Sequence, residues 1–224
     1  MKKLIIFDAY GTLISSGNSS IESCKKILSL QEKEIDPYEF YGKWKKLHRK
    51  HIDESNDNTF LCEWDIFTKD LRCLYEIYKI NRPYKEDIKY MFETQFNRKV
   101  FDDVLQTINI LKEKYRIVIG STADTYPLLK NMKDNNLDVD NVYTSEIIKK
   151  YKPHMDFYNY IIKKENVNID EVIFVGDSLL DDIYGPKQLN ITTVLIDRNN
   201  MYNDKNIKPD YIINSLKELI YLDL

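Results

Sequence analysis

Residues 4–16 read LIIFDAYGTLISS, and the start of this stretch decides the fold class. Four apolar residues, 4–7, lead straight into Asp8, and Gly11 and Thr12 follow three and four residues later. An uninterrupted apolar run of this length is typical of a strand buried on both faces of a parallel sheet. The run therefore predicts a strand with a carboxylate at its carboxyl end, and the glycine supplies backbone freedom for the turn that follows.

Similar short apolar runs recur along the chain and end in acidic or small polar residues. The predicted strands are 3–8, 116–121, 172–177 and 192–197, with weaker candidates at 141–144 and 211–213. Segments with helical periodicity alternate with the later strands, at 103–114, 126–135, 155–165 and 180–189. This alternation predicts an α/β fold, a doubly wound parallel sheet.

The interval between the first two of these strands breaks the alternation. It carries helix-period segments and no convincing strand, at 21–30, 40–51, 59–80 and 85–96. Pro37 and Pro83 separate the helices, because proline is disfavoured within a helix. We therefore predict an all-helical insertion, or cap, at residues 17–98, within a Rossmann-like core formed by residues 1–16 and 99–224.

Composition narrows the class of protein. Charged residues make up 31% and hydrophobic residues 43% of the 224-residue chain, as in ordinary globular proteins, and the net charge is −3. We expect no nucleic-acid partner and no membrane, because the chain has no basic footprint and its first apolar run stops at Asp8. Cys24, Cys62 and Cys73 form no CxxC pair, which favours a reduced, cytoplasmic setting. We expect a monomer or homodimer acting on a small-molecule substrate.

Three predicted strands end in residues that can carry chemistry, namely Asp8, Ser121 and Asp177. The carboxyl ends of parallel strands meet at one edge of the sheet, where the sites of open α/β folds lie. Any one of these residues alone could be a helix N-cap or a turn residue. Their shared position at one edge favours an active site.

These motifs resemble those of the haloacid dehalogenase superfamily of hydrolases, over nearly the whole chain. Residues 8–12, DAYGT, resemble the first motif, whose aspartate attacks the substrate. Ser121 resembles the second motif, which hydrogen-bonds the bound group, and Lys152 in YKP resembles the third-motif lysine. Residues 176–182, GDSLLDD, resemble the acidic fourth motif that holds magnesium in the phosphatase members, and the insertion resembles the family's type 1 cap.

The resemblance implies a role for each of these side chains. The implied catalytic residues are Asp8, Tyr10 and Lys152. The implied substrate-binding residues are Thr12, Ser121, Thr122 and Lys152. The implied ligands of Mg²⁺ are Asp8, the Tyr10 carbonyl, Asp177 and Asp182, with Asp181 as the alternative to Asp182.

Charge also argues for a metal. Lys152 brings one positive charge, while Asp8, Asp177 and one acid of the pair 181–182 bring about three negative charges. Like unit charges 4 Å apart repel by about 4 kcal/mol at an effective dielectric constant of 20, so this site would repel a phosphate dianion. One Mg²⁺ ion, which accepts carboxylate oxygens, brings the sum to about zero.

Tyr10 stands where phosphatases of this family usually carry a second aspartate, which protonates the leaving oxygen and later activates water. Tyrosine is a poor base at neutral pH. DAYGTL instead resembles the L-2-haloacid dehalogenases, which release a halide that needs no proton. Those enzymes use no metal, lack this acidic fourth motif and bind the halide through a cap arginine, for which Lys43 is the best match here.

We therefore favour a magnesium-dependent phosphatase of a small phosphorylated metabolite, working through an aspartyl-phosphate on Asp8. The first alternative is a haloacid dehalogenase that uses Asp8 without metal. The second alternative is a catalytically weak relative that binds a ligand or partner, which Tyr10 alone supports.

Overall fold

Six parallel strands form a single sheet in the order β3-β2-β1-β4-β5-β6. The computed structural model describes residues 2–222. The strands are β1 (Leu4–Phe7), β2 (Arg116–Ser121), β3 (Asn141–Thr144), β4 (Val172–Gly176), β5 (Thr192–Ile196) and β6 (Tyr211–Ile213). β1 lies inside the sheet, between β2 and β4, with Leu4 beside Arg116 and Val172. The predicted α/β fold with a parallel sheet is confirmed.

The apolar run of β1 serves both faces of the sheet. Ile5 and Phe7 pack into one hydrophobic cluster with α5 and α6, while Leu4 and Ile6 pack into another with α8. Successive side chains of a strand point to opposite faces, so both faces need apolar residues. All four side chains are fully buried, and each such burial stabilises the fold by about 1.5–3 kcal/mol.

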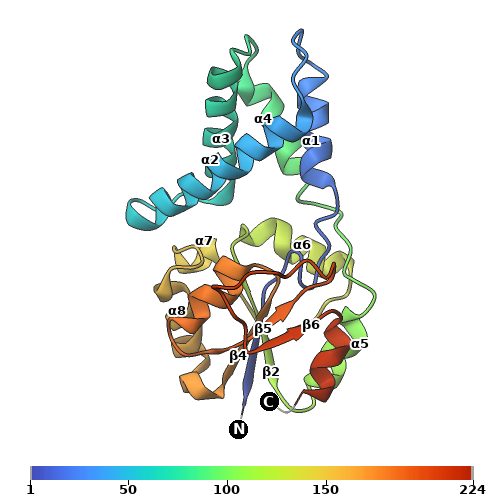
Figure 1. Cartoon of the computed structure of the whole chain (residues 1–224), viewed down its shortest axis with the longest axis vertical. Helices are drawn as coiled ribbons and strands as arrows, with labels where there is room; N and C mark the ends of the chain where they lie inside the picture. Colours follow the sequence, from blue (N-terminus) through green and yellow to red (C-terminus); the bar gives the residue numbers. More distant parts are fainter. Residues whose placement is uncertain (1, 223–224) are drawn as a thin grey trace.

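The helices of the core cover these two faces (Figure 1). They are α5 (Val104–Leu111), α6 (Thr125–Asp134), α7 (Ser145–Ile148), α8 (Met155–Glu165) and α9 (Gly185–Lys187), with short helical turns η1 (Ile169–Glu171), η2 (Leu179–Tyr184) and η3 (Leu216–Tyr221). The helix predicted at 180–189 forms as a π-helical turn, η2, that continues directly into α9, so the helical segment covers residues 179–187. Pro186 has no N–H to donate, so it interrupts the hydrogen-bond ladder there.

The four helices between β1 and α5 in sequence stand over the end of the sheet where β1 finishes (Figure 1). They are α1 (Ser19–Leu28), α2 (Pro37–Asp57), α3 (Glu63–Tyr78) and α4 (Tyr84–Glu93). Their inward side chains, among them Phe40, Leu71 and Met91, form a hydrophobic cluster of their own. α2 starts earlier than predicted, because Asp36 accepts a hydrogen bond from the Tyr38 N–H at 3.2 Å and proline suits the first helical turn.

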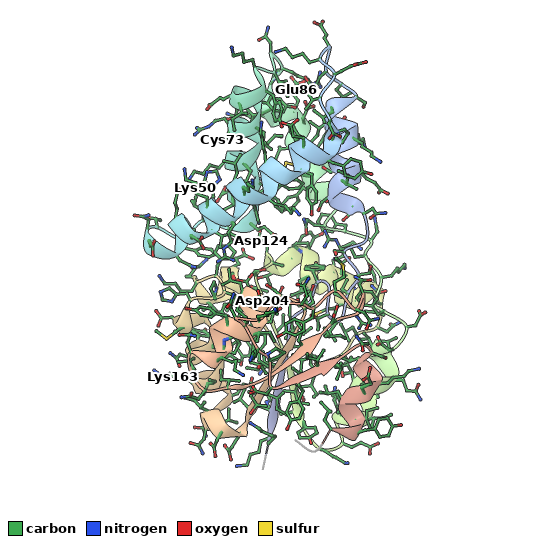
Figure 2. All side chains as sticks on the ribbon, in the orientation of Figure 1. Lys50, Cys73, Glu86, Asp124, Lys163 and Asp204 are labelled. Atoms are coloured by element: carbon green, nitrogen blue, oxygen red, sulfur yellow. The ribbon has the colours of Figure 1, made fainter. Side chains whose placement is uncertain are left out.

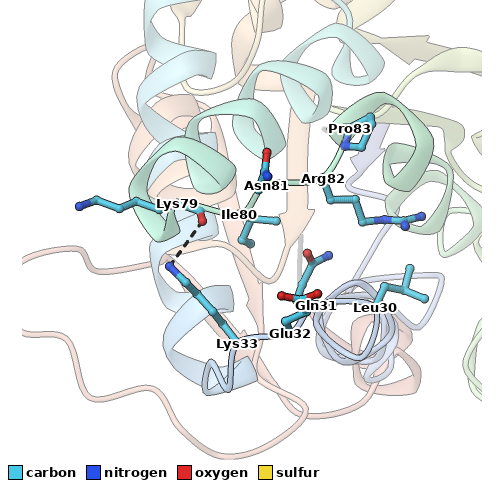
Figure 3. A pocket seen from close by; sticks show the side chains of 9 residues that line it. All are labelled: Leu30, Gln31, Glu32, Lys33, Lys79, Ile80, Asn81, Arg82 and Pro83. Carbon is cyan, nitrogen blue, oxygen red and sulfur yellow. Dashed lines mark hydrogen bonds between the residues drawn. The ribbon is translucent and has the colours of Figure 1, made fainter.

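The far end of this insertion is hollowed between its two loops (Figure 3). The hollow has a volume of about 380 Å³, and Lys33 Nζ donates to the Lys79 carbonyl across it at 3.4 Å. It borders none of the strand-end residues. Within residues 2–222, no helix combines the length and hydrophobicity that crossing a membrane requires.

Candidate active site

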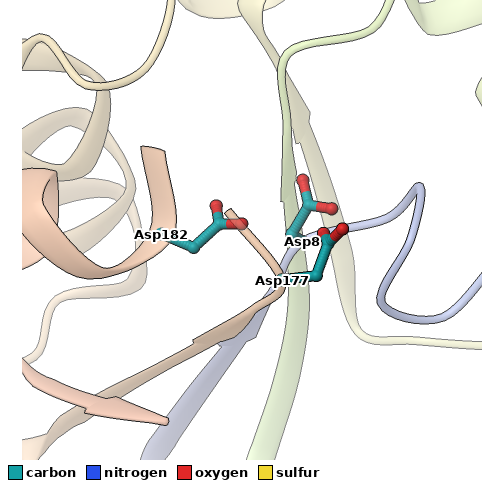
Figure 4. A group of neighbouring side chains, drawn as sticks. All are labelled: Asp8, Asp177 and Asp182. Carbon is teal, nitrogen blue, oxygen red and sulfur yellow. The ribbon is translucent and has the colours of Figure 1, made fainter. Parts of the chain in front are cut away.

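Adjacent strands bring two of the predicted acids together. Asp8 follows β1 and Asp177 follows β4, and these strands run in register with Phe7 beside Val175. The Asp8 and Asp177 carboxylates lie side by side, while Asp182 approaches from η2 (Figure 4). One oxygen from each of the three lies within 4.8 Å of the other two. The strand-end pattern thus leads to one cluster of three carboxylates.

Lys152 joins this cluster from the loop between α7 and α8. Its Nζ donates to Asp8 Oδ1 at 2.7 Å and to Asp182 Oδ1 at 2.6 Å, and the side chain is only 1% exposed. Burial alone would lower the pKa of Lys152, but the Asp182 and Asp8 carboxylates together raise it above its ordinary value. Lys152 therefore stays charged at neutral pH and holds two of the three acids.

One lysine does not neutralise three carboxylates. Burial, followed by the charge of Asp8, raises the pKa of Asp177 to about 7. Burial raises the pKa of Asp182 well above its ordinary value, against the attraction of Lys152. Carboxylate oxygens are the ligands that Mg²⁺ prefers, and octahedral Mg²⁺ with bonds of about 2.1 Å places opposite ligands about 4 Å apart. The donor atoms, their spacing and their excess negative charge fit a divalent cation.

Two glycines allow the carboxylates to approach this closely. Gly11 has φ +98°, and a Cβ there would lie 2.2 Å from Asp177 Oδ2. A Cβ on Gly176 would lie 2.3 Å from Asp182 Cγ. Any larger residue at either position would displace a carboxylate of the cluster.

The predicted substrate-binding residues lie at the same edge of the sheet. The buried Thr12 hydroxyl donates to Asp177 Oδ1 at 3.3 Å, so Thr12 contacts an acid of the cluster directly. Ser121 is buried at the end of β2, and its Oγ accepts from the Ala123 N–H at 3.3 Å. Thr122 follows it and is partly exposed. Their contacts with substrate stay a prediction.

The Tyr10 side chain makes its hydrogen bond to α6. Its hydroxyl accepts a hydrogen bond from Asn131 Nδ2 at 2.9 Å, and the Arg98 guanidinium lies 4.6 Å from the ring centroid. Burial raises the pKa of Tyr10 to about 12. The phenol therefore keeps its proton at neutral pH.

Asp181, the alternative to Asp182, points to the insertion. Arg49 of α2 donates from Nη1 to Asp181 Oδ1 at 2.9 Å and from Nη2 to the Lys152 carbonyl at 3.3 Å. No sequence motif marks Arg49, and Lys43 is the residue that the sequence offers for the position of the halide-binding arginine. Lys43 instead pairs with Glu39 at 3.2 Å within α2. Which basic side chain of α2 reaches the core depends on how the insertion packs against it, and this cannot be read from the sequence of α2.

The parallel sheet with lysine-bridged acids at one edge is the architecture of an α/β enzyme. A family model identifies the particular family. Residues 2–190 match the model that describes haloacid dehalogenase-like hydrolases. The chain belongs to the haloacid dehalogenase-like hydrolases, as its motifs predicted.

Individual relatives resemble parts of the sequence or the whole fold. A glyceraldehyde 3-phosphate phosphatase of Methanocaldococcus jannaschii is 39% identical over 84 residues, which are 36% of each chain. A glyceraldehyde 3-phosphate phosphatase of Pyrococcus furiosus is 29% identical over 50% of this chain and 49% of its own. The chain thus spans between about a third and a half of these relatives. The L-2-haloacid dehalogenase structure of Xanthobacter autotrophicus matches 99% of this chain and 98% of its own, with TM-score 0.81 and 16% identity, and shows a shared fold.

Proposed function

We propose that the chain is a magnesium-dependent phosphatase of a small phosphorylated metabolite, with Asp8 as the nucleophile. The observation that carries the proposal is the excess of acids at the sheet edge: within residues 2–222, Lys152 is the one cation that forms ion pairs with the cluster Asp8, Asp177 and Asp182, and it pairs with Asp8 and Asp182. A metal-free site of this charge would repel an anionic substrate. The partial relatives named as glyceraldehyde 3-phosphate phosphatases support a phosphoryl substrate.

Each residue has a defined part in this proposal. Asp8 attacks phosphorus with one oxygen while Lys152 holds the other at 2.7 Å, which orients the carboxylate. Ser121 and Thr122 donate to the phosphoryl oxygens, and Thr12 holds Asp177 in place. Asp8, the Tyr10 carbonyl, Asp177 and Asp182 would hold Mg²⁺, which neutralises phosphoryl charge when bound. The helical insertion, residues 17–98, would act as the cap that selects the substrate.

The dehalogenase alternative rests on Tyr10, because a halide leaves without a proton. One screen separates the two activities. Phosphate release is measured on glyceraldehyde 3-phosphate, glycerol phosphate and sugar phosphates, and chloride release on 2-chloropropionate, each with Mg²⁺ or with EDTA. Phosphate release that EDTA abolishes and Mg²⁺ restores is expected. Dechlorination in EDTA, without phosphate release, would overturn the proposal.

The nucleophile is tested with Asp8→Asn and a matched control. Asp8→Asn should reduce phosphate release by orders of magnitude and abolish trapping of a phosphorylated enzyme. Asp102→Asn, which changes an exposed acid of the core, should leave turnover unchanged. Substantial turnover in the Asp8 variant would exclude the aspartyl-phosphate.

A further inference from the structure

In the proposed phosphatase Asp8, Asp177 and Asp182 hold the metal, so none of these three acids is free to give a proton to an alkoxide leaving group. Tyr10 occupies the position two residues after Asp8, where such an acid is expected, but Asn131 and Arg98 contact its side chain. With its pKa raised to about 12 by burial, the Tyr10 phenol is also unable to act as a base at neutral pH. An alkyl phosphatase at this site needs an acid and base from elsewhere in the chain.

The insertion holds an acid at the junction with the core. Glu63 is the first residue of α3, and its backbone N–H donates to Asp124 Oδ1 at 2.8 Å. The next N–H, that of Trp64, donates to Asp124 Oδ2 at 3.0 Å. Asp124 is buried three residues beyond the end of β2, and Figure 2 shows it between the insertion and the sheet. These bonds fix the start of α3 over the catalytic edge.

The Glu63 carboxylate itself is without a partner. It is partly buried, yet its side chain makes no hydrogen bond or ion pair within residues 2–222. His48 and Arg98 lie near enough to oppose the rise in its pKa that burial causes, and Glu63 in turn acts on the pKa of Tyr10. The charges of His48 and Arg98 thus act on a carboxylate that the Asp124 bonds hold at the junction of the insertion and the core.

Helix capping does not explain this position. An acid in the first turn of a helix interacts favourably with the helix dipole, and it can do so while exposed to solvent. Asp65 is also in the first turn of α3 and is exposed. Burial raises the pKa of Glu63 to about 7, so its acid and base forms are both present at neutral pH.

On the basis of the proposed phosphatase function, we propose that Glu63 is the general acid and base of this site, supplied by the insertion. In the first step the Asp8 oxygen bonds to phosphorus, the phosphorus–alkoxide bond breaks, and the Glu63 proton goes to the departing oxygen. In the second step water attacks the phosphorus of the aspartyl-phosphate and gives its proton to Glu63, while the bond to Asp8 breaks. The sum is hydrolysis of a phosphate monoester, with both side chains restored.

Glu63→Gln tests the assignment, with Asp65→Asn as the matched control on the same helical turn. For glycerol phosphate, Glu63→Gln should lower kcat by about 10²-fold or more. For p-nitrophenyl phosphate, whose leaving group needs no proton, it should give a burst of about one nitrophenolate per enzyme before a slow steady state, because the second step has lost its base. Asp65→Asn should behave as the wild type, and circular dichroism checks that both variants fold.

Other outcomes separate this inference from the phosphatase proposal. Equal slowing of both substrates without a burst would show a structural role and overturn the Glu63 assignment. A burst in His48→Gln but not in Glu63→Gln would overturn it in favour of the imidazole. If Asp8→Asn abolishes turnover of glycerol phosphate and Glu63→Gln leaves it intact, only the Glu63 assignment fails. If the wild type releases no phosphate, both proposals fail.

Discussion

Replacing Lys152 by methionine should destabilise the metal-free protein strongly. The ammonium lies 2.7 Å from Asp8 and 2.6 Å from Asp182, and each contact is a gross attraction of about 6 kcal/mol at an effective dielectric constant of 20. Most of this attraction offsets the cost of burying the charges, so the pair itself stabilises little. Removing one partner, however, leaves buried acids without their cation and costs about 3–5 kcal/mol.

Urea unfolding in EDTA measures this loss, and its pH dependence identifies the cause. The raised pKa of Lys152 means that its stabilisation is fully present at neutral pH. The neighbouring acids have raised pKa values, so protonation at pH 5 relieves their repulsion in Lys152→Met. The loss should therefore be larger at pH 8 than at pH 5, and Mg²⁺ should recover part of it at pH 8.

Two further variants provide the controls. Lys163→Met changes an exposed lysine of α8 and should unfold as the wild type does. Adding Asp182→Asn to Lys152→Met should restore part of the lost stability, because it removes one uncompensated charge. A Lys152→Met protein with wild-type stability in EDTA at pH 8 would refute the reasoning that one lysine holds the cluster together.

Three other substitutions test the site and the insertion. Gly11→Ala should abolish turnover and weaken Mg²⁺ binding in calorimetry, because the new Cβ would lie 2.2 Å from Asp177 Oδ2. The control Gly17→Ala, also at positive φ but with open space around it, should retain turnover and Mg²⁺ binding. Tyr10→Phe should lower the free energy of unfolding by about 1–2 kcal/mol through the lost amide contact, and a large loss of kcat would show that the hydroxyl takes part in chemistry. Arg49→Ala should raise KM and speed limited proteolysis of the insertion, because it removes bonds from α2 to the core; unchanged values of both would contradict this role.

Local sequence patterns were sufficient to predict the strands of the sheet and the position of the acid cluster. Continuous apolar runs identified all six strands, and the acids directly after β1 and β4 identified the edge of the sheet that holds the acid cluster. The choice between Asp181 and Asp182 needed the geometry of η2, because adjacent residues of a turn point in different directions. Arg49 and Glu63 act across the junction of two packed units, and no local pattern encodes such contacts.

The interior position of β1 has a consequence for how this chain is made. β1 is synthesised first, but its hydrogen-bonding partners β2 and β4 end at Ser121 and Gly176. At about 5–20 residues per second, an emerging chain carries this apolar strand for about 10–30 s before β4 is complete. The insertion made in the meantime has its own hydrophobic cluster and can pack without the sheet. Among the interior strands, β1 thus waits for its second neighbour over the longest stretch of synthesis, and this makes the segment that ends in Asp8 the part of the sheet most exposed to aggregation during that time.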